Sequence, residues 1–283
     1  MASVTFAGQI YLLMKKVTAI VFAIVFITCK NKDTQQGDQG NGTTTKQDQP
    51  AVLSYSIIPP PYPHDTASFT QGLTFYKGEM YEGTGYNGKS KLMKVDLKTG
   101  KVIKSIPLDY KYFGEGIAIL RDTIYQLTWQ QNVVFAYAIN GKDFKRVKEF
   151  PISTEGWGIT TDGKSLIVST GGNNLDYYDP ATFTKQRSLP ITDAGADSYN
   201  LNELEYIDGY IYANQWQASY IFKIDPATGK IVAKANLARE EDAAKAIYPG
   251  ADVLNGIAYD ETTKKIYVTG KYWPSLYEIQ FSK

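Results

Sequence analysis

Residues 71–108 read QGLTFYKGEMYEGTGYNGKSKLMKVDLKTGKVIKSIPL, and this pattern returns four more times along the chain. The later copies begin at Glu115, Trp157, Asn202 and Asn255, so the starts are 44, 42, 45 and 53 residues apart. Each copy alternates apolar and polar residues in short runs separated by Gly, Asp and Asn, as half-buried strands and hairpin turns do. Four strands in about 40–45 residues are typical of one propeller blade. The sequence therefore predicts an all-β fold, a five-bladed β-propeller.

The fifth copy stops after its third strand, close to the end of the chain. We expect residues 51–59, AVLSYSIIP, to supply the missing strand, because they alternate in the same way as the fourth strands of the other copies. This N-terminal strand would complete the last blade, close the ring and remove two open sheet edges. The extra residues 237–252 are rich in Ala, Glu and Lys, which predicts a short helix before Pro249.

The chain before the repeats divides into a leader, residues 1–29, and a tether, residues 30–50. In the leader, two lysines precede an apolar run, residues 17–28, which is shorter than the ~20 residues that span a bilayer but suits a signal peptide. The run ends at Cys29, as a bacterial lipoprotein signal ends at its lipidation cysteine; the alternative is a plain secretory signal with an incidental cysteine. The tether has no apolar residue except its last, Pro50, so it cannot pack. We expect an exported protein, periplasmic or at the cell surface, whose membrane contact is a lipid on Cys29 and whose folded domain is residues 51–283.

The amino-acid composition excludes several kinds of partner and active site. The chain has 30 Lys and Arg against 29 Asp and Glu, a net charge of +1, which gives no reason to expect a nucleic-acid partner. One histidine, His64, and one cysteine cannot build an ordinary zinc site or an internal disulfide, and a Ser–His–Asp or Cys–His nucleophile would have to use His64. His64 follows a Pro-rich stretch and is interpreted as a loop residue. We expect no metal or cofactor in the site, although a Ca²⁺ site made only of acidic side chains stays open.

Several residues break the repeat at equivalent positions, and equivalent positions of a propeller converge at one end of its channel. Ahead of or at the start of the first strand of each copy stand Gln71, Glu115, Trp157, Asn202 and Asn255. In the second strand and the following loop stand Glu82, Gln126, Trp129, Asn214, Trp216, Lys271 and Trp273. Together they predict an aromatic pocket with a few polar groups, as small-ligand sites have. The alternatives are ordinary structural roles: tryptophans packed between blades, Asn202 and Asn255 as turn formers, Glu115 in a salt bridge, and Glu82 or Lys271 simply solvated.

The motifs around these positions resemble those of the glutaminyl cyclases, or glutamine cyclotransferases, of the plant and bacterial type. The resemblance covers residues 55–281 and includes, in order, FTQGL from Phe69, YEGTG from Tyr81, GEG from Gly114, EGWG from Glu155, NELE from Asn202 and TGKYWP from Thr269. The family's usual motif has Ser where Gly83 stands here. The resemblance implies a five-bladed propeller and a zinc-independent acyltransferase. Its reaction converts the N-terminal Gln of peptides or proteins to pyroglutamate and releases ammonia.

The resemblance also implies roles for individual residues. Glu82 matches the family's catalytic glutamate and would relay the proton, while Lys271 and Asn202 are candidates for polarising the amide oxygen. The expected substrate-binding residues are Gln71, Phe69, Glu115, Trp129, Trp157, Asn214, Trp216 and Trp273. The protein is expected to act as a monomer. The alternative function is a non-catalytic surface propeller that binds a peptide or glycan, and a quinoprotein or lactonase-like propeller is a weaker third.

Overall fold

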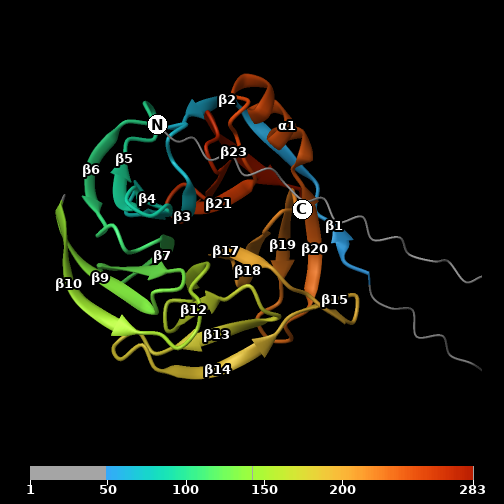
Figure 1. Cartoon of the computed structure of the whole chain (residues 1–283). Helices are drawn as coiled ribbons and strands as arrows, with labels where there is room; N and C mark the ends of the chain where they lie inside the picture. Colours follow the sequence, from blue (N-terminus) through green and yellow to red (C-terminus); the bar gives the residue numbers. More distant parts are fainter. Residues whose placement is uncertain (1–48, 142, 283) are drawn as a thin grey trace, which may run out of the picture. The chain divides into compact units, whose positions relative to one another are not determined.

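Each of the first four predicted repeats forms the four antiparallel strands of one blade, and the fifth repeat forms three, in the computed structural model, which describes residues 49–141 and 143–282. The leader and nearly all of the tether lie outside the described residues. The blades contain, from the inner to the outer strand, β3 (Thr70–Tyr76), β4 (Glu79–Thr84), β5 (Lys91–Val95) and β6 (Val102–Pro107); β7 (Gly114–Leu120), β8 (Thr123–Thr128), β9 (Val133–Asn140) and β10 (Asp143–Pro151); β11 (Ile159–Thr161), β12 (Leu166–Ser169), β13 (Asn174–Tyr178) and β14 (Lys185–Pro190); β17 (Leu201–Ile207), β18 (Tyr210–Gln215), β19 (Tyr220–Ile224) and β20 (Ile231–Asn236); and β21 (Leu254–Asp260), β22 (Lys265–Gly270), β23 (Ser275–Phe281) and β2 (Tyr55–Pro63). Figure 1 shows β3, β7, β17 and β21 near the centre of the ring and the outer strands at its periphery. The fold is therefore a five-bladed β-propeller.

The N-terminal strand β2 supplies the outer strand of the fifth blade. It runs antiparallel to β23, with Tyr55 opposite Phe281 and Ile57 opposite Ile279. The strand begins later than residue 51, because Ala51–Val52 forms the separate strand β1, which pairs in parallel with β20 of the fourth blade. The N-terminal segment thus joins two blades.

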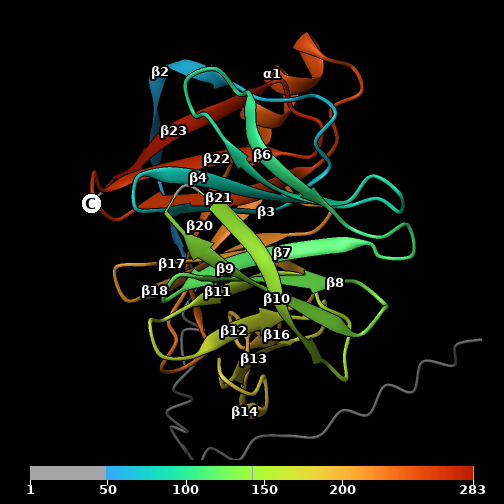
Figure 2. The ribbon, with the colours of Figure 1, turned by 90° about the vertical axis from the view of Figure 1, so that its left-hand side faces the viewer.

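The short helix α1 (Ala238–Ile247) lies between the fourth and fifth blades in the sequence, as its composition predicts. Figure 2 shows it at the edge of the fifth blade. Leu237 and Ala244 are fully buried in an apolar cluster that also contains Tyr277 and Ile279 of β23. A two-stranded hairpin, β15 (Thr192–Asp193) with β16 (Ala196–Asp197), precedes the fourth blade.

Glycine at one level of the inner strands lets the blades approach closely around the axis. Gly72, Gly116, Gly158 and Gly256 occupy this level in four blades. A Cβ atom on Gly158 would lie 1.9 Å from the backbone oxygen of Asn202, a distance that no side chain can adopt. In the fourth blade the corresponding residue is Glu203, which accepts hydrogen bonds from the backbone N–H groups of Leu73 (3.2 Å) and Ile257 (2.9 Å). Glu203 therefore ties three inner strands together.

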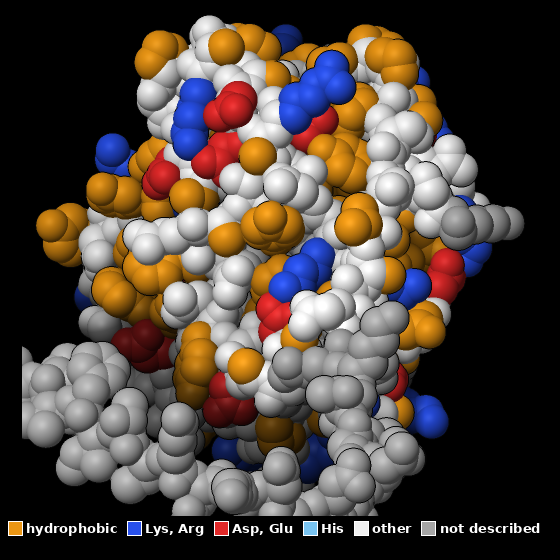
Figure 3. Space-filling view, turned by 90° about the vertical axis from the view of Figure 1, so that its right-hand side faces the viewer, with side chains coloured by type: hydrophobic (Ala, Val, Ile, Leu, Met, Phe, Trp, Pro, Cys, Tyr) orange, Lys and Arg blue, Asp and Glu red, His pale blue; other side chains and the backbone are white. Residues whose placement is uncertain are grey.

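The outer surface carries both signs of charge. On the side with β1, β20 and α1, Lys and Arg side chains are interspersed with Asp and Glu and with apolar side chains (Figure 3). This mixture agrees with the net charge of +1. In the described parts of the chain, no helix is long and apolar enough to cross a membrane.

Candidate active site

A cavity of about 170 Å³ opens where the inner strands begin. This volume is smaller than the about 300–1,000 Å³ of ordinary small-ligand pockets, which suits a compact ligand group. Aromatic rings form most of the wall, and a carboxyl group, an amine and two carboxamides interrupt it. The lining residues are Phe69, Gln71, Phe113, Glu115, Trp129, Trp157, Asn202, Trp216 and Lys271.

The structure brings together eight of the eleven residues that the sequence analysis selected for the site. The one lining residue that it missed is Phe113. The sequence could have predicted that Phe113 lines the cavity, because Phe113 stands two residues before Glu115 just as Phe69 stands two residues before Gln71. The two phenylalanines are edge to face, with ring centroids 6.1 Å apart, so the first two blades contribute a matched pair of rings.

Glu115 is the carboxyl group of the cavity. It is the second residue of strand β7 and is 5% exposed. Its Oε1 atom accepts a hydrogen bond from Nε2 of Gln71 at 3.0 Å. Burial raises the pKa of Glu115 well above its usual range; the positive charge of Lys271 opposes this shift and the negative charge of Glu155 adds to it. Such a carboxyl group exchanges protons at a pH nearer to neutrality than a solvated one.

Lys271 is the cation of the cavity and follows strand β22. It is 3% exposed, and burial lowers its pKa, while Glu115 and Asp252 favour the charged form. Its Nζ atom lies 4.5 Å from the ring centroid of Phe69, within cation–π range. Backbone hydrogen bonds from Lys271 N–H to Val253 (3.0 Å) and from Asp252 N–H to Lys271 (2.8 Å) fix its position.

The second amide of the wall, Asn202, has an oxygen atom that is unpartnered within the described part of the chain. Its Oδ1 atom is buried and has no hydrogen-bond partner among the described residues. A buried carbonyl oxygen without a partner is costly, so it favours a ligand that brings an N–H group. Trp157 and Trp216 flank this region and contact each other edge to face, with ring centroids 5.7 Å apart.

Gln71 is oriented by a residue outside the cavity. Asn255 Nδ2 donates to Oε1 of Gln71 at 3.3 Å and to the backbone oxygen of Thr70 at 2.9 Å. With its oxygen engaged in this way, Gln71 directs its Nε2 group toward Glu115. Three blades thus cooperate to place one carboxyl group, and Asn255 does more than form a turn.

Glu82 lies outside the set of cavity-lining residues. It is 1% exposed on β4, where its Oε1 atom accepts from the hydroxyl of Thr70 at 2.7 Å and lies 3.2 Å from Nε2 of His64. His64 is itself buried, and its Nδ1 atom lies 2.7 Å from the backbone oxygen of Trp273. Burial alone would lower the pKa of His64, but Glu82 and the Trp273 carbonyl raise it above its ordinary value. His64 lies in the loop after β2, as the sequence predicts, but its side chain is buried and paired with Glu82.

Two other residues selected from the sequence also lie behind the wall. Trp273 is fully buried and donates from Nε1 to the backbone oxygen of Asp252 at 2.8 Å. Asn214 is fully buried and accepts from the backbone N–H of Gly256 at 2.9 Å. Both hold backbone segments, and neither lines the cavity.

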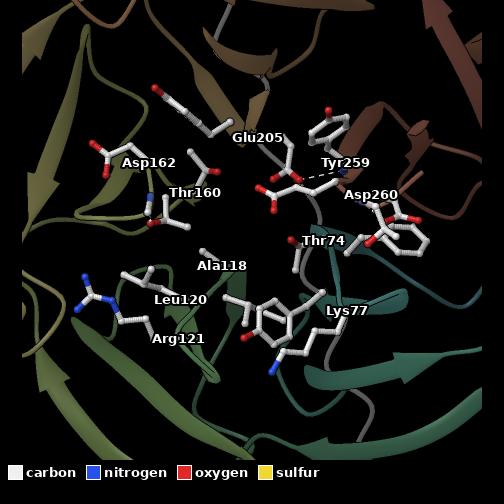
Figure 4. Close-up of a pocket in the computed structure, with 18 residues that line it drawn as sticks. Thr74, Lys77, Ala118, Leu120, Arg121, Thr160, Asp162, Glu205, Tyr259 and Asp260 are labelled. Atoms are coloured by element: carbon white, nitrogen blue, oxygen red, sulfur yellow. Dashed lines mark hydrogen bonds between the residues drawn. The ribbon is translucent and has the colours of Figure 1, made fainter. Parts of the chain in front are cut away.

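A second hollow, of about 520 Å³, lies where the inner strands end, and so at the other end of the channel. It is lined by the last residues of the inner strands and the turns after them, including Thr74, Ala118, Thr160, Glu205 and Tyr259 (Figure 4). Glu205 is buried and accepts from the backbone N–H of Tyr259 at 2.9 Å. This hollow has none of the tryptophans or the buried amine of the first cavity, so we assign the chemistry to the first.

In residues 49–141 and 143–282, no three His, Cys, Asp or Glu side chains are grouped so that they could hold a metal ion. The cavity instead combines a proton-exchanging carboxyl group, a buried cation and hydrogen-bonding amides within aromatic walls. These groups can bind a small polar chain, exclude water and move a proton between two atoms of it. A nucleophilic hydroxyl or thiol is not among the lining residues.

Comparison with known proteins identifies the class. The family model described as glutamine cyclotransferase matches residues 23–281, so the chain belongs to the glutamine cyclotransferase family. The glutaminyl-peptide cyclotransferase of Arabidopsis thaliana is 39% identical over 231 residues, which cover 78% of this chain and 70% of the plant protein. The crystal structure of the glutaminyl cyclase of Myxococcus xanthus matches with a TM-score of 0.77 and 33% identity, over 83% of this chain and 99% of that one.

Proposed function

We propose that this protein is a glutaminyl-peptide cyclotransferase that converts the N-terminal Gln of peptides or proteins to pyroglutamate and ammonia. The observation that carries the proposal is the small aromatic cavity in which Glu115 and Lys271 are both buried. An N-terminal Gln presents an amine and a carboxamide that must meet within one folded side chain. The cavity volume of about 170 Å³ suits that compact shape and leaves the rest of the peptide outside.

Glu115 is the proton relay in this proposal, in the place that the family resemblance gave to Glu82. The α-amine of the substrate has a free pKa of about 7.7–8.0 and must be neutral to attack. As the nitrogen forms a bond to the side-chain amide carbon, Glu115 takes its proton and then delivers a proton to the departing nitrogen. The carbon–nitrogen bond of the amide breaks, ammonia leaves, and the carboxylate is restored. A raised pKa makes both transfers easier near neutral pH.

Lys271 and the carboxamides complete the reaction site. The Lys271 amine stabilises the negative charge that develops on the amide oxygen, a contribution that is large in a buried site. The free Oδ1 atom of Asn202 receives an N–H of the substrate amine or carboxamide. The tryptophans enclose the folded side chain, which holds amine and amide in reacting geometry.

Ammonia release from a Gln dipeptide or from Gln-β-naphthylamide tests this function. We expect turnover by the purified protein and none with the corresponding Asn or Glu compounds. Binding of Gln peptides without ammonia release would favour the non-catalytic alternative. Full release after Glu115→Gln substitution would remove Glu115 from the mechanism.

We also propose that the protein is an exported, monomeric lipoprotein, held in the periplasm or at the cell surface by a lipid on Cys29. The proposal is supported by the leader that ends at Cys29 and by the polar tether, residues 30–50, that follows it. Membrane fractionation of cells that express the full chain tests it: Cys29→Ser should release the protein from the membrane fraction. Light scattering of the purified folded domain tests the monomeric state.

A further inference from the structure

The loop between β10 and β11 places Glu155 beside the cavity without making it a lining residue. The backbone N–H of Gly156 donates to Thr128 at 3.2 Å, and the N–H of Trp157 donates to Ser169 at 3.0 Å. A Cβ atom on Gly156 would lie 2.8 Å from the side chain of Leu127, so the loop can lie this close to β8 only with glycine there. The position of Glu155 is therefore fixed by its backbone neighbours.

The Glu155 carboxylate joins two walls of the cavity that come from different blades. Its Oε2 atom accepts hydrogen bonds from Nε1 of Trp129 at 2.9 Å and from Nε1 of Trp157 at 3.0 Å. Its Oε1 atom accepts from Nε2 of Gln130 at 3.0 Å. One oxygen thus sets the relative position of two indole rings, both of which line the cavity.

We propose that Glu155 is a positioning residue of the cyclisation reaction, which holds Trp129 and Trp157 as a clamp around the folded Gln side chain. This inference rests on the proposed function. Trp129 is 37% exposed and has a ring contact with Phe113, but Glu155 is the acceptor for its N–H group. Without that acceptor, the indole ring of Trp129 could adopt other rotamers more easily. A displaced wall would leave the reacting amine and amide less well oriented.

The charge of Glu155 suits this role. Partial burial favours the neutral carboxyl group, but the hydrogen bonds from Trp157, Gln130 and Trp129 outweigh it and lower the pKa of Glu155. The carboxylate is therefore ionised at neutral pH and keeps its acceptor sites free of protons. Its charge also contributes to the raised pKa of Glu115, which in turn faces the cation of Lys271.

Two substitutions separate position from charge. Glu155→Ala removes the acceptor for both indoles, whereas Glu155→Gln keeps one oxygen that can accept from both and loses the charge. We expect Glu155→Ala to lower kcat/KM about ten- to a hundredfold, as small misplacements of reacting groups do. Glu155→Gln should recover most of that loss. Glu149→Ala, which removes a solvent-exposed carboxylate on β10, is the matched control.

The indole N–H signals in a ¹H–¹⁵N spectrum give a readout that does not depend on activity. In Glu155→Ala, the signals of Trp129 and Trp157 should shift and exchange faster with solvent. The signal of Trp273 should stay in place, because its N–H is bound to the backbone of Asp252. Unmoved Trp129 and Trp157 signals would overturn the clamp, even if the variant is less active.

The kinetic outcomes separate this inference from the function on which it rests. If the wild-type protein releases no ammonia from Gln peptides, the proposed function fails, whatever the variants do. If the wild type is active and Glu155→Ala has an unchanged kcat/KM, the positioning role alone fails. If Glu155→Gln is as impaired as Glu155→Ala, charge and not position is what the residue supplies, and the proposal is again wrong.

Discussion

Nε2 of His64 lies 3.2 Å from Oε1 of Glu82, in a buried pair that is separate from the cavity lined by Glu115. This relationship favours Glu115 over Glu82 as the catalytic candidate, of the two carboxyl groups that the repeats place near the same end of the channel. Glu82 has its oxygen engaged by His64 and Thr70, and it can support the wall behind Phe69 and Gln71. Glu115 faces the cavity and Lys271, so it is the group that a substrate can reach.

The first prediction compares these two carboxyl groups. Glu115→Gln keeps the size of the side chain but cannot carry a proton, so kcat should fall about 10²–10⁴-fold. Glu82→Gln should lower kcat less than tenfold, since Glu82 does not line the cavity. Steady-state ammonia release measures both. A larger loss in Glu82→Gln than in Glu115→Gln would return the catalytic role to Glu82.

The assignment of Glu82 as the catalytic residue rests on the family resemblance and stays a prediction, but the contacts that Glu82 makes could not be derived from the sequence. Strand alternation identifies the face of a strand on which a side chain lies, but it does not reveal which partners that face meets. Glu82 stands opposite Leu73 in the β3–β4 ladder, and its partner His64 contacts Trp273, a residue 209 positions away. Such a contact becomes visible only when the ring is closed. The role of His64 in a buried pair was hidden for the same reason.

Other features were predictable because their causes are local. Each of the first four blades contains its own four strands within one repeat, and the fifth repeat contains three, so the five copies were sufficient to predict the propeller. The cavity could be predicted because residues at equivalent positions of different repeats, such as Gln71 and Glu115, converge at one end of the channel. The position of Glu155 could not be predicted, because nothing in the sequence indicates that one of its carboxylate oxygens reaches two indoles.

The second prediction concerns Lys271. Lys271→Met keeps a side chain of similar length but removes the cation, and loss of one oxyanion donor costs about 10²–10³-fold in kcat. Because Lys271 lowers the pKa of Glu115, the pKa of Glu115 should rise in the variant. In a plot of kcat/KM against pH, the limb that reports the ionisation of Glu115 should therefore move to higher pH. Lys98→Met, in an exposed turn, is the control. An unshifted limb would mean that it reports another group.

The third prediction concerns closure of the ring. A chain that starts at Gln49 should be soluble and active, because no residue before it is assigned to the site. Removing residues 51–58 as well deletes the part of β2 that pairs with residues 278–281, the C-terminal part of β23. It also removes Tyr55 and Ile57 from the apolar cluster of the fifth blade.

This deletion should cost several kcal/mol of burial and pairing, and each kcal/mol lowers Tm by about 2–4 °C in a domain of this size. Differential scanning calorimetry of the two chains measures the change. A Tm that stays within one or two degrees would show that β2 contributes little to ring closure.

The last prediction uses Glu205, in the hollow at the other end of the channel (Figure 4). Burial raises the pKa of Glu205 well above its ordinary value of 4.5, and the charge of Glu261 adds to the shift. The folded protein therefore favours the protonated carboxyl group. The associated stability is complete below the pKa of the unfolded chain and is lost as the pH rises toward the pKa of the folded state. Glu205→Gln removes this titration and keeps an oxygen that can accept from the N–H of Tyr259.

The wild type and Glu205→Gln should thus have similar Tm values near pH 4. The variant should become the more stable of the two as the pH rises, by about 1.36 kcal/mol for each unit by which the pKa is displaced. Thermal melts from pH 4 to pH 9 measure the difference, with Glu261→Gln as a second variant that should show the same trend to a smaller extent. A constant difference across this range would mean that Glu205 titrates alike in the folded and unfolded chains. A difference that grows toward low pH would mean that the folded state stabilises the carboxylate, and that the hollow favours a negative charge on Glu205.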